Sequence, residues 1–247
     1  YLQVVITIFM ILFGINFNAY FLLITRKFAQ AFKMEEVRYY LGIIAIAVLI
    51  ITCNIYHMYG SVSESLQQAA FQVGSIITTT GYATTDFNLW PEISRTILVM
   101  LMFIGACAGS TGGGIKVSRI LILCKTIRKE LHIFLHPNAV KKIKMDGKVI
   151  PHEVLRSTNI FIIVYILIIA GSVFLIAFDD FDLITNFTAV TATFNNIGPG
   201  LELVGPIGNF GMFSWFSKIV LTFDMLAGRL EIFPLLLLFV RDTWKKF

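Results

Sequence analysis

Long apolar segments constrain the fold of this chain more than any other feature of its sequence. Each is near or above the about 20 residues that cross a bilayer as a helix. They lie at residues 1–24, 39–59, 93–108, 160–178 and 211–240. Hydrophobic residues make up 57% of the chain and charged residues 14%, whereas soluble domains carry about 25% charged residues. A soluble core could not bury so many apolar segments, so the sequence predicts an integral protein of the lipid bilayer.

Basic residues are concentrated in alternate connections between these segments. Lys and Arg gather after the first segment, between Ile115 and Arg156, and at the C-terminus, while the intervening connections carry Asp and Glu. The positive-inside rule places the basic connections and the C-terminus in the cytoplasm. The acidic connections then face outward, where they attract cations. A nucleic-acid partner would also account for a basic segment, but the alternation from side to side favours membrane topology, and we expect no nucleic acid to bind.

Two stretches of the chain follow the same plan, in which an apolar span precedes a shorter, more polar helix, a glycine turn and a second span. In the first stretch these elements lie at 39–59, 64–78, 78–85 and from about 93. In the second they lie at 156–178, 180–194, 195–201 and from about 211. Gly81 aligns with Gly198 at an offset of 117 residues (198 minus 81). The sequence therefore predicts two structural repeats.

The shorter helix of each repeat is the informative element. About fifteen residues span only about 22 Å at 1.5 Å per residue, which is too short to cross about 30 Å of hydrocarbon. Such a segment is expected to enter the membrane from the acidic side and to return through a non-helical turn. Irregular backbone at that depth persists only where protein or a water-filled cavity covers it. A single glycine turn would be ordinary, but interrupted segments at matching positions of two repeats indicate a transport site.

The residues of each glycine turn suit the coordination of a dehydrated cation. Backbone carbonyls arranged in rings replace the hydration shell of such an ion, and glycine gives the chain the freedom to aim them at one axis. We therefore expect a K⁺ filter at Thr79, Thr80, Gly81 and Tyr82, and at Asn195, Asn196, Ile197 and Gly198. The carbonyls expected to bind K⁺ are those of Thr79, Thr80, Asn196 and Ile197.

Two turns cannot enclose an axis, and a K⁺-channel-like ring needs four. We therefore expect two more turns upstream or in another chain. The chain begins at Tyr1 inside an apolar run, without Met or a signal-peptide pattern. This start indicates that the chain is part of a longer polypeptide, with residues 1–26 at the end of a preceding unit.

The glycine-rich stretch GACAGSTGGGIK, residues 105–116, suggests a phosphate-binding loop but does not have the required spacing. Starting from Gly109, the second glycine of the P-loop pattern falls at Gly114, and Ile115 then occupies the place of the lysine. A serine-hydrolase elbow also fails, because Ala108 replaces its first glycine. We therefore expect that the protein is not an enzyme. Each glycine costs a helix about 1 kcal/mol relative to Ala, so this stretch breaks the second span, either across the ion path or as a kink that permits close helix packing.

Arg229 lies at the corresponding break in the second repeat, aligned with Ser110. A charge at the bilayer centre costs roughly 2.5–3.5 kcal/mol on insertion scales, so such a residue usually faces a cavity and has a partner. One alternative is an ion pair with Asp224, five residues earlier on the same span. The other is a charged barrier in the path of a cation, and the two are compatible.

Five motifs together resemble the C-terminal half of a Trk-type subunit of the Trk/Ktr/HKT superfamily of potassium transporters. They are TTTGYATTDFNLWP, FIGACAGSTGGGIKVSR, ELHIFLHPNAVKKIKMDGKVIPHEVLRS, NNIGPGL and MLAGRLEIFPLLLL. The resemblance implies an all-α integral membrane fold of helix–pore-helix–helix units around a pseudo-fourfold pore. It implies the end of a second unit at 1–26, a third unit at 39–131, a basic cytoplasmic connection at 132–155 and a fourth unit at 156–241.

The resemblance also implies a function. It implies K⁺ uptake through the bacterial plasma (inner) membrane, with K⁺ as the transported ion and no other cofactor. It implies an intramembrane gate at Gly109, Ser110, Thr111, Gly112, Gly113 and Gly114, with Arg229 as an electrostatic barrier. The expected partners are a second copy of the subunit and a cytosolic nucleotide-binding regulatory subunit of the RCK (TrkA-like) type. A Na⁺-permeable member, or one that couples K⁺ to H⁺ or Na⁺, remains an alternative.

Overall fold

The computed structural model describes residues 1–138, 142–230, 232–238 and 244, and the protein is almost entirely helical there. In chain order the helices are α1 (Leu2–Phe13), α2 (Phe17–Ile24), α3 (Phe28–Lys33), α4 (Glu35–Tyr59), α5 (Val62–Ile77), α6 (Glu92–Ile104), α7 (Val117–Leu135), α8 (His152–Ile176), α9 (Leu183–Phe194), α10 (Trp215–Arg229) and α11 (Ile232–Leu237). Short 3₁₀ turns lie at Phe87–Leu89, Ala177–Asp179, Glu202–Val204 and Phe210–Met212.

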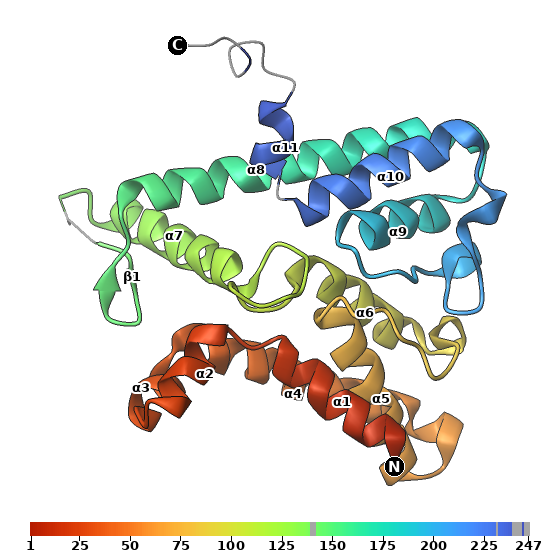
Figure 1. The fold of residues 1–247 in the computed structure, drawn as a ribbon, viewed down its shortest axis with the longest axis horizontal. Coiled ribbons are helices and arrows are strands. Elements are labelled where there is room, and N and C mark those ends of the chain that lie inside the picture. Colours follow the sequence, from red (N-terminus) through yellow and green to blue (C-terminus); the bar gives the residue numbers. More distant parts are fainter. Residues whose placement is uncertain (139–141, 231, 239–243, 245–247) are drawn as a thin grey trace.

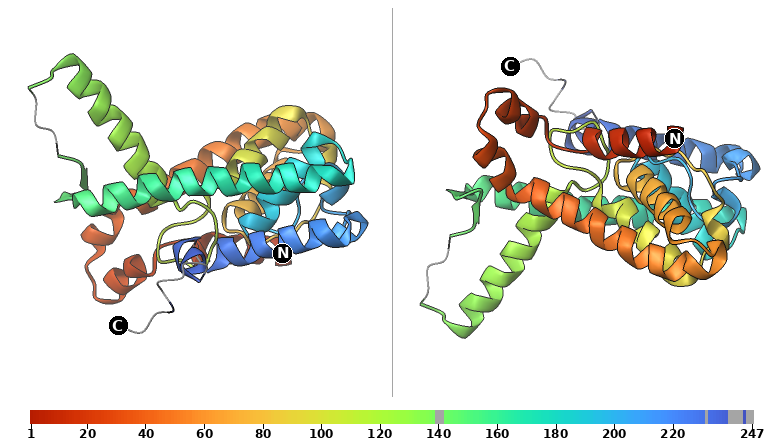
Figure 2. Two further views of the ribbon diagram at one scale, coloured as in Figure 1. Left: turned by 90° about the horizontal axis from the view of Figure 1, so that it is seen from above. Right: turned by 90° about the horizontal axis from the view of Figure 1, so that it is seen from below.

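The helices form two groups with the same element order (Figure 1). In one group the long helix α4 packs against the shorter α5, and α6 contacts both. In the other group the long helix α8 contacts α9 and α10, which also contact each other. The groups meet where α6 contacts α9. Figure 2 shows α7 diverging from the bundle at the end away from the connections between α4 and α5 and between α9 and α10.

The spans are less continuous than the hydropathy of the sequence predicts. Within the described residues, α4 and α8 with its following turn (His152–Asp179) are long and apolar enough to cross a membrane. The predicted span 1–24 is instead two helices bent by 93°. The bend has a local cause: the Asn16 side chain accepts a hydrogen bond from the Asn18 backbone N–H at 2.8 Å, which caps α2 and begins a new helix.

The predicted spans from 93 and from 211 are also interrupted. Helix α6 ends at Ile104 because Gly105 takes a positive φ of 71°, and a Cβ built there would stand 2.4 Å from the Gly113 carbonyl oxygen. Helix α10 ends at Arg229, and a short helix follows from Ile232. The end of the predicted 211–240 span, and residues 239–241 of the predicted fourth unit, lie outside the described residues.

The protein is mostly helical, as expected, and its basic connection contains in addition a small antiparallel hairpin that was not predicted. Strands β1 (Lys144–Met145) and β2 (Lys148–Val149) pair Lys144 with Val149 and Met145 with Lys148. Asp146 and Gly147 form the turn at φ values of 51° and 77°. Two consecutive positive φ angles define the type I′ turn, for which Asp-Gly is a preferred pair.

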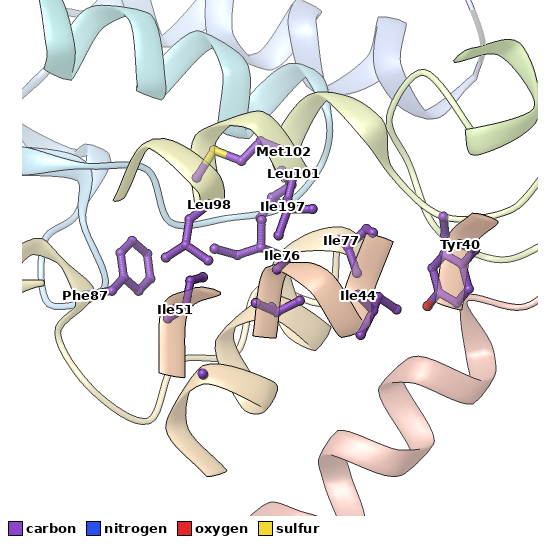
Figure 3. Close-up of a cluster of buried hydrophobic side chains, with 14 of the residues drawn as sticks. Tyr40, Ile44, Ile51, Ile76, Ile77, Phe87, Leu98, Leu101, Met102 and Ile197 are labelled. Carbon is purple, nitrogen blue, oxygen red and sulfur yellow. The ribbon is translucent and has the colours of Figure 1, made fainter. Parts of the chain in front are cut away.

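The apolar core joins the two helix groups. Figure 3 shows one cluster that includes Tyr40, Ile44 and Ile51 of α4, Ile76 and Ile77 of α5, and Leu98, Leu101 and Met102 of α6. Ile197, from the turn after α9, is 3% exposed and packs into this same cluster. Burial of such a side chain contributes about 1.5–3 kcal/mol. The second glycine turn is thereby fixed against the helices of the first group.

Candidate functional site: two glycine turns above a glycine-rich loop

The turns that follow α5 and α9 have the same hydrogen-bond pattern. Thr80 N–H donates to the Ser75 carbonyl at 2.9 Å, and Ile197 N–H donates to the Ala192 carbonyl at 2.9 Å. Each pair closes over the last turn of its helix in the way that a helix C-terminus commonly does. The donors are 117 residues apart (197 minus 80), as are the acceptors (192 minus 75). This offset equals the one between the two turn glycines.

The backbone angles of the two turns also correspond. Thr79 and Asn196 adopt the left-handed region at φ 55° and 54°, and Gly81 and Gly198 follow two residues later at φ 81° and 115°. A residue with a side chain rarely adopts such angles, and their cost is of order 1–3 kcal/mol each. Strain of this kind, repeated at equivalent positions, is typical of a functional segment.

The two turns lie against each other. A Cβ atom built on Gly81 would stand 1.9 Å from the Ile197 carbonyl oxygen, and one built on Gly198 would stand 3.9 Å from the Gly81 Cα. The structure therefore brings together the two glycines that the sequence pattern singles out. At residue 81 only glycine permits this approach.

Seven carbonyl oxygens of the two turns have no donor in the described part of the chain. They belong to Thr79, Thr80, Gly81, Asn195, Asn196, Ile197 and Gly198, and they include the four that were expected to bind K⁺. Backbone carbonyls inside proteins are normally paired, so unpaired ones in facing turns are suited to a cation. Tyr82 differs, because its carbonyl accepts a hydrogen bond from the Ser75 hydroxyl at 2.6 Å and its side chain is exposed.

Side chains of the turns hold the backbone in place. The buried Asn195 accepts a hydrogen bond from the Tyr165 hydroxyl at 2.8 Å, and Asn196 Nδ2 donates to the Met225 carbonyl at 3.0 Å. The Thr78 and Thr80 hydroxyls lie 2.8 Å apart. These side chains therefore hold the turns in shape. The backbone carbonyls are the groups that remain available to bind a cation.

The glycine-rich loop lies directly against the ends of α5 and α9. Gly113 N–H donates to Thr79 Oγ1 at 2.8 Å. A Cβ on Gly112 would stand 3.2 Å from the Thr78 carbonyl oxygen, and one on Gly113 would stand 2.4 Å from that of Asn195. Thr78 and Asn195 are equivalent positions of the two turns, so the loop approaches both helix ends in the same way. Side chains at 112 and 113 would prevent this close contact.

Arg229 reaches the same loop from α10. Its Nη1 donates to the Thr111 carbonyl at 3.1 Å. Asp224 instead accepts a hydrogen bond from the Ser172 hydroxyl at 2.7 Å, and among the described residues no ion pair joins it to Arg229. The Arg229 side chain thus contacts the glycine-rich loop and does not pair with Asp224 of its own helix.

A cavity of about 280 Å³ lies beside this contact. Its polar lining includes Ser110, Thr111, Lys116, Arg119, Asn195 and Arg229. Three of these side chains are basic, and they come from the loop, from α7 and from α10.

The opposite arm of the loop is attached to the bend between α1 and α2 and to α4. Cys107 N–H donates to the Gly14 carbonyl at 3.0 Å, and Phe17 N–H donates to the Gly109 carbonyl at 3.3 Å. Glu36, which the sequence analysis did not single out, accepts a hydrogen bond from Ala108 N–H at 2.6 Å. The available signal was an acidic pair, Glu35–Glu36, within a basic connection.

Two aspartates of the acidic connections accept hydrogen bonds from backbone N–H groups near the starts of helices. Asp182 Oδ2 accepts a hydrogen bond from Thr185 N–H at 2.9 Å and caps α9, while the Asp179 carboxylate accepts from Ser214 N–H at 2.8 Å. Burial raises the pKa of Asp182, but its hydrogen bonds to the start of α9 outweigh this effect and leave the pKa below its ordinary value. The Asp182 carboxylate is therefore ionised at neutral pH.

Comparison with known proteins gives one consistent result. The model of the TrkH family, described as cation transport protein, matches residues 1–246. The Trk system potassium uptake protein TrkH of Salmonella typhimurium is 37% identical over 99% of this chain and 51% of its own length. That of Escherichia coli K12 is 36% identical over the same shares.

A solved structure agrees with the sequence relatives. The crystal structure of the potassium transporter TrkH from Vibrio parahaemolyticus matches with a TM-score of 0.86 and 35% identity, over 98% of this chain and 53% of that one. The chain thus spans about half the length of the curated relatives it matches.

Proposed function

Because the chain belongs to the TrkH family of cation transport proteins, we propose that it forms half of a pore-forming subunit for K⁺ uptake across the bacterial plasma membrane. The similar proteins of Salmonella and Escherichia are named potassium uptake proteins. The remaining half would supply two further turns, since a ring of carbonyls needs four. The C-terminal residues 245–247, expected in the cytoplasm, lie outside the described residues.

The pair of facing turns with unpaired carbonyls carries the proposal. Oxygens from Thr79, Thr80, Asn196 and Ile197 would replace part of the hydration shell of K⁺. The C-terminal ends of α5 and α9 also point toward the turns, and their negative dipole ends favour a cation. The matched offset of 117 residues supports two pseudo-equivalent units, at 39–131 and 156–241, joined by the basic connection 132–155 and preceded by the end of another unit at 1–26.

The loop from Gly109 to Gly114 and Arg229 would form the gate. Ser110 and Thr111 give the loop its polar character, while Gly112 and Gly113 let it close against the helix ends. The Arg229 guanidinium would add an electrostatic barrier on the cytoplasmic side. An alternative remains in which the loop only permits close helix packing; the polar contacts to Thr79 and Arg229 favour the gate.

The partners of the subunit are part of the proposal. The relatives are named as parts of a Trk system, which supports a partner among other components of such a system. We propose that the partners are a cytosolic nucleotide-binding regulatory subunit and a second copy of this subunit. The basic segment 116–156 is the surface we propose for docking. A Na⁺-permeable or H⁺- or Na⁺-coupled member of the superfamily is the second candidate, because the first two turns of the filter belong to the other half.

Rb⁺ uptake into proteoliposomes tests the proposal, using the full-length protein with K⁺ and Na⁺ as competitors. We expect K⁺ to inhibit strongly and Na⁺ weakly. In Gly198→Ser the side chain would strain a backbone at φ 115°, by about 1–3 kcal/mol. The preference for K⁺ should therefore fall about tenfold or more.

Gly60→Ser is the matched control for this experiment. Gly60 also has a positive φ, 66°, but nothing lies within 4 Å of a Cβ built there. It should retain the K⁺ preference. Equal selectivity in Gly198→Ser and wild type would contradict the filter, and strong inhibition by Na⁺ in the wild type would favour the second candidate.

A further inference from the structure

Glu36 is a buried carboxylate that contacts three separate parts of the chain. It lies in the first turn of α4 and is 3% exposed. Its Oε1 accepts hydrogen bonds from Ala108 N–H at 2.6 Å and from Ser118 N–H at 3.2 Å. Its Oε2 accepts from Asn16 Nδ2 at 3.2 Å. One side chain thus joins α4, the glycine-rich loop, the start of α7 and the bend between α1 and α2.

The hydrogen bonds accepted by the Glu36 carboxylate are stronger than those between two neutral groups. A hydrogen bond to an ionised group is roughly twice as strong as a neutral one, and burial excludes the water that would compete for it. Helix α7 has no acidic residue in its own first turn. Glu36 supplies the negative charge that the N-terminus of a helix favours. The same oxygen therefore fixes both the loop and the helix that continues from it.

The contacts divide the loop into two arms. The anchored arm, at 107–109, is attached to Gly14, Phe17 and Glu36. The inner arm, at 111–113, contacts Arg229 and the turn residue Thr79. Gly109 and Gly114 bound the inner arm with φ values of 68° and 79°. A carboxylate that holds the anchored arm and the α7 start sets the position of the inner arm between them.

We propose that Glu36 is the positioning residue of the gate, and that its carboxylate holds the loop 105–116 closed beneath the glycine turns. This inference rests on the gating role proposed for the loop. Release of Ala108 and Ser118 would remove a charged anchor at each end of the loop and leave only backbone hydrogen bonds there, such as Cys107 N–H to Gly14 and Val117 N–H to Ala106. The inner arm would then leave the ends of α5 and α9 more often. Glu36 contacts no atom of the filter, so its effect is on opening and not on ion preference.

The neighbouring residue provides a matched control. The Glu35 carboxylate pairs with Lys125 of α7, and the Glu35 backbone N–H donates to Asp146 Oδ1 of the hairpin at 2.7 Å. Glu35 therefore contacts α7 and the hairpin but not the loop. Its side chain is 30% exposed, and its removal deletes the same charge one residue away.

Initial Rb⁺ uptake by the full-length protein in proteoliposomes tests the proposal. Glu36→Ala should raise uptake about tenfold, because hydrogen bonds to a charged group are lost at both ends of the loop. Glu36→Gln keeps the size of the side chain and one acceptor oxygen, so it should raise uptake by a smaller factor. Glu35→Gln should match wild type. The ratio of K⁺ to Na⁺ inhibition should be unchanged in all three.

Deletion of Gly112–Gly114 separates this inference from the gate itself. The deletion alone should raise uptake, and Glu36→Ala should add nothing further in the deleted protein, because Glu36 acts through the loop. An equal increase in both backgrounds, or no increase in a folded Glu36→Ala, would overturn the role of Glu36 while leaving the gate. If the deletion alone leaves uptake unchanged, both the gate and this inference fail. Where Glu36→Ala does not fold, Glu36→Gln takes its place in the same comparison.

Discussion

At the scale of single residues, the chemistry of this molecule depends on backbone atoms that glycine exposes. Gly81 allows the Ile197 carbonyl oxygen to approach, and Gly112 and Gly113 allow the loop to approach Thr78 and Asn195. Such positions can be predicted from the sequence, because glycine in an otherwise apolar span has few other uses. Tyr82 was expected in the filter turn but not among the ligating carbonyls, and its carbonyl accepts a hydrogen bond from the Ser75 hydroxyl.

Arg229 gives a prediction at the same scale. Arg229→Ala removes a hydrogen bond from a charged group to the loop, worth about 1.5–3 kcal/mol, together with a positive charge beside the cavity. K⁺ flux should rise about tenfold or more, while the K⁺ over Na⁺ preference should not change. Flux measurements in proteoliposomes check both.

The exposed Arg128 on α7 is the control for Arg229, and Arg128→Ala should leave flux unchanged. A folded Arg229→Ala with unchanged or lower flux would count against the barrier. A changed ion preference would place Arg229 in the selectivity step instead.

At the scale of helices, hydropathy predicted where apolar segments lie but not where they bend. The bend after Gly14 combines the local Asn16 cap with a contact to a distant part of the chain, the hydrogen bond from Cys107 N–H to the Gly14 carbonyl. A periodicity contains no information about such contacts. The role of Glu36 could not be predicted for the same reason, because its hydrogen-bond partners are 20 to 82 residues away in sequence. The hairpin was predictable from Asp146–Gly147 and was missed.

The cap of α9 gives a pH prediction. The pKa of Asp182 is lowered in the folded state, so its stabilisation is present at neutral pH. It is lost as pH falls through the lowered pKa, below the ordinary value of about 3.9. Between pH 7 and pH 3, Tm should therefore fall more in wild type than in Asp182→Asn, which carries no titrating group at this cap. Thermal unfolding in detergent measures this.

Asp180→Asn is the adjacent control for the cap, since Asp180 caps no α-helix in the described chain and asparagine tolerates its φ of 59°. Its Tm should fall with pH as that of wild type does. Identical pH dependence in wild type and Asp182→Asn would mean that the cap does not contribute.

At the scale of the whole molecule, the two helix groups are held together on both sides of the glycine turns. Ile197 inserts into the core of the first group. On the outer side Asn88 Nδ2 donates to the Glu202 carbonyl at 3.0 Å, and Asn88 Oδ1 accepts from Glu202 N–H at 3.0 Å. These contacts fix the relative position of the turns. The match to the TrkH family model confirms the family that the motifs predicted.

The position of a bound ion shows whether the two glycine turns form the filter. Crystals of the full-length protein grown in Rb⁺, with diffraction measured at the Rb⁺ absorption edge, locate the ion by anomalous scattering. We expect a peak between the two turns, in contact with the carbonyl oxygens of Thr80 and Ile197 and near Gly113. A preparation that takes up Rb⁺ but shows its ion elsewhere, with no peak between the turns, would contradict the filter.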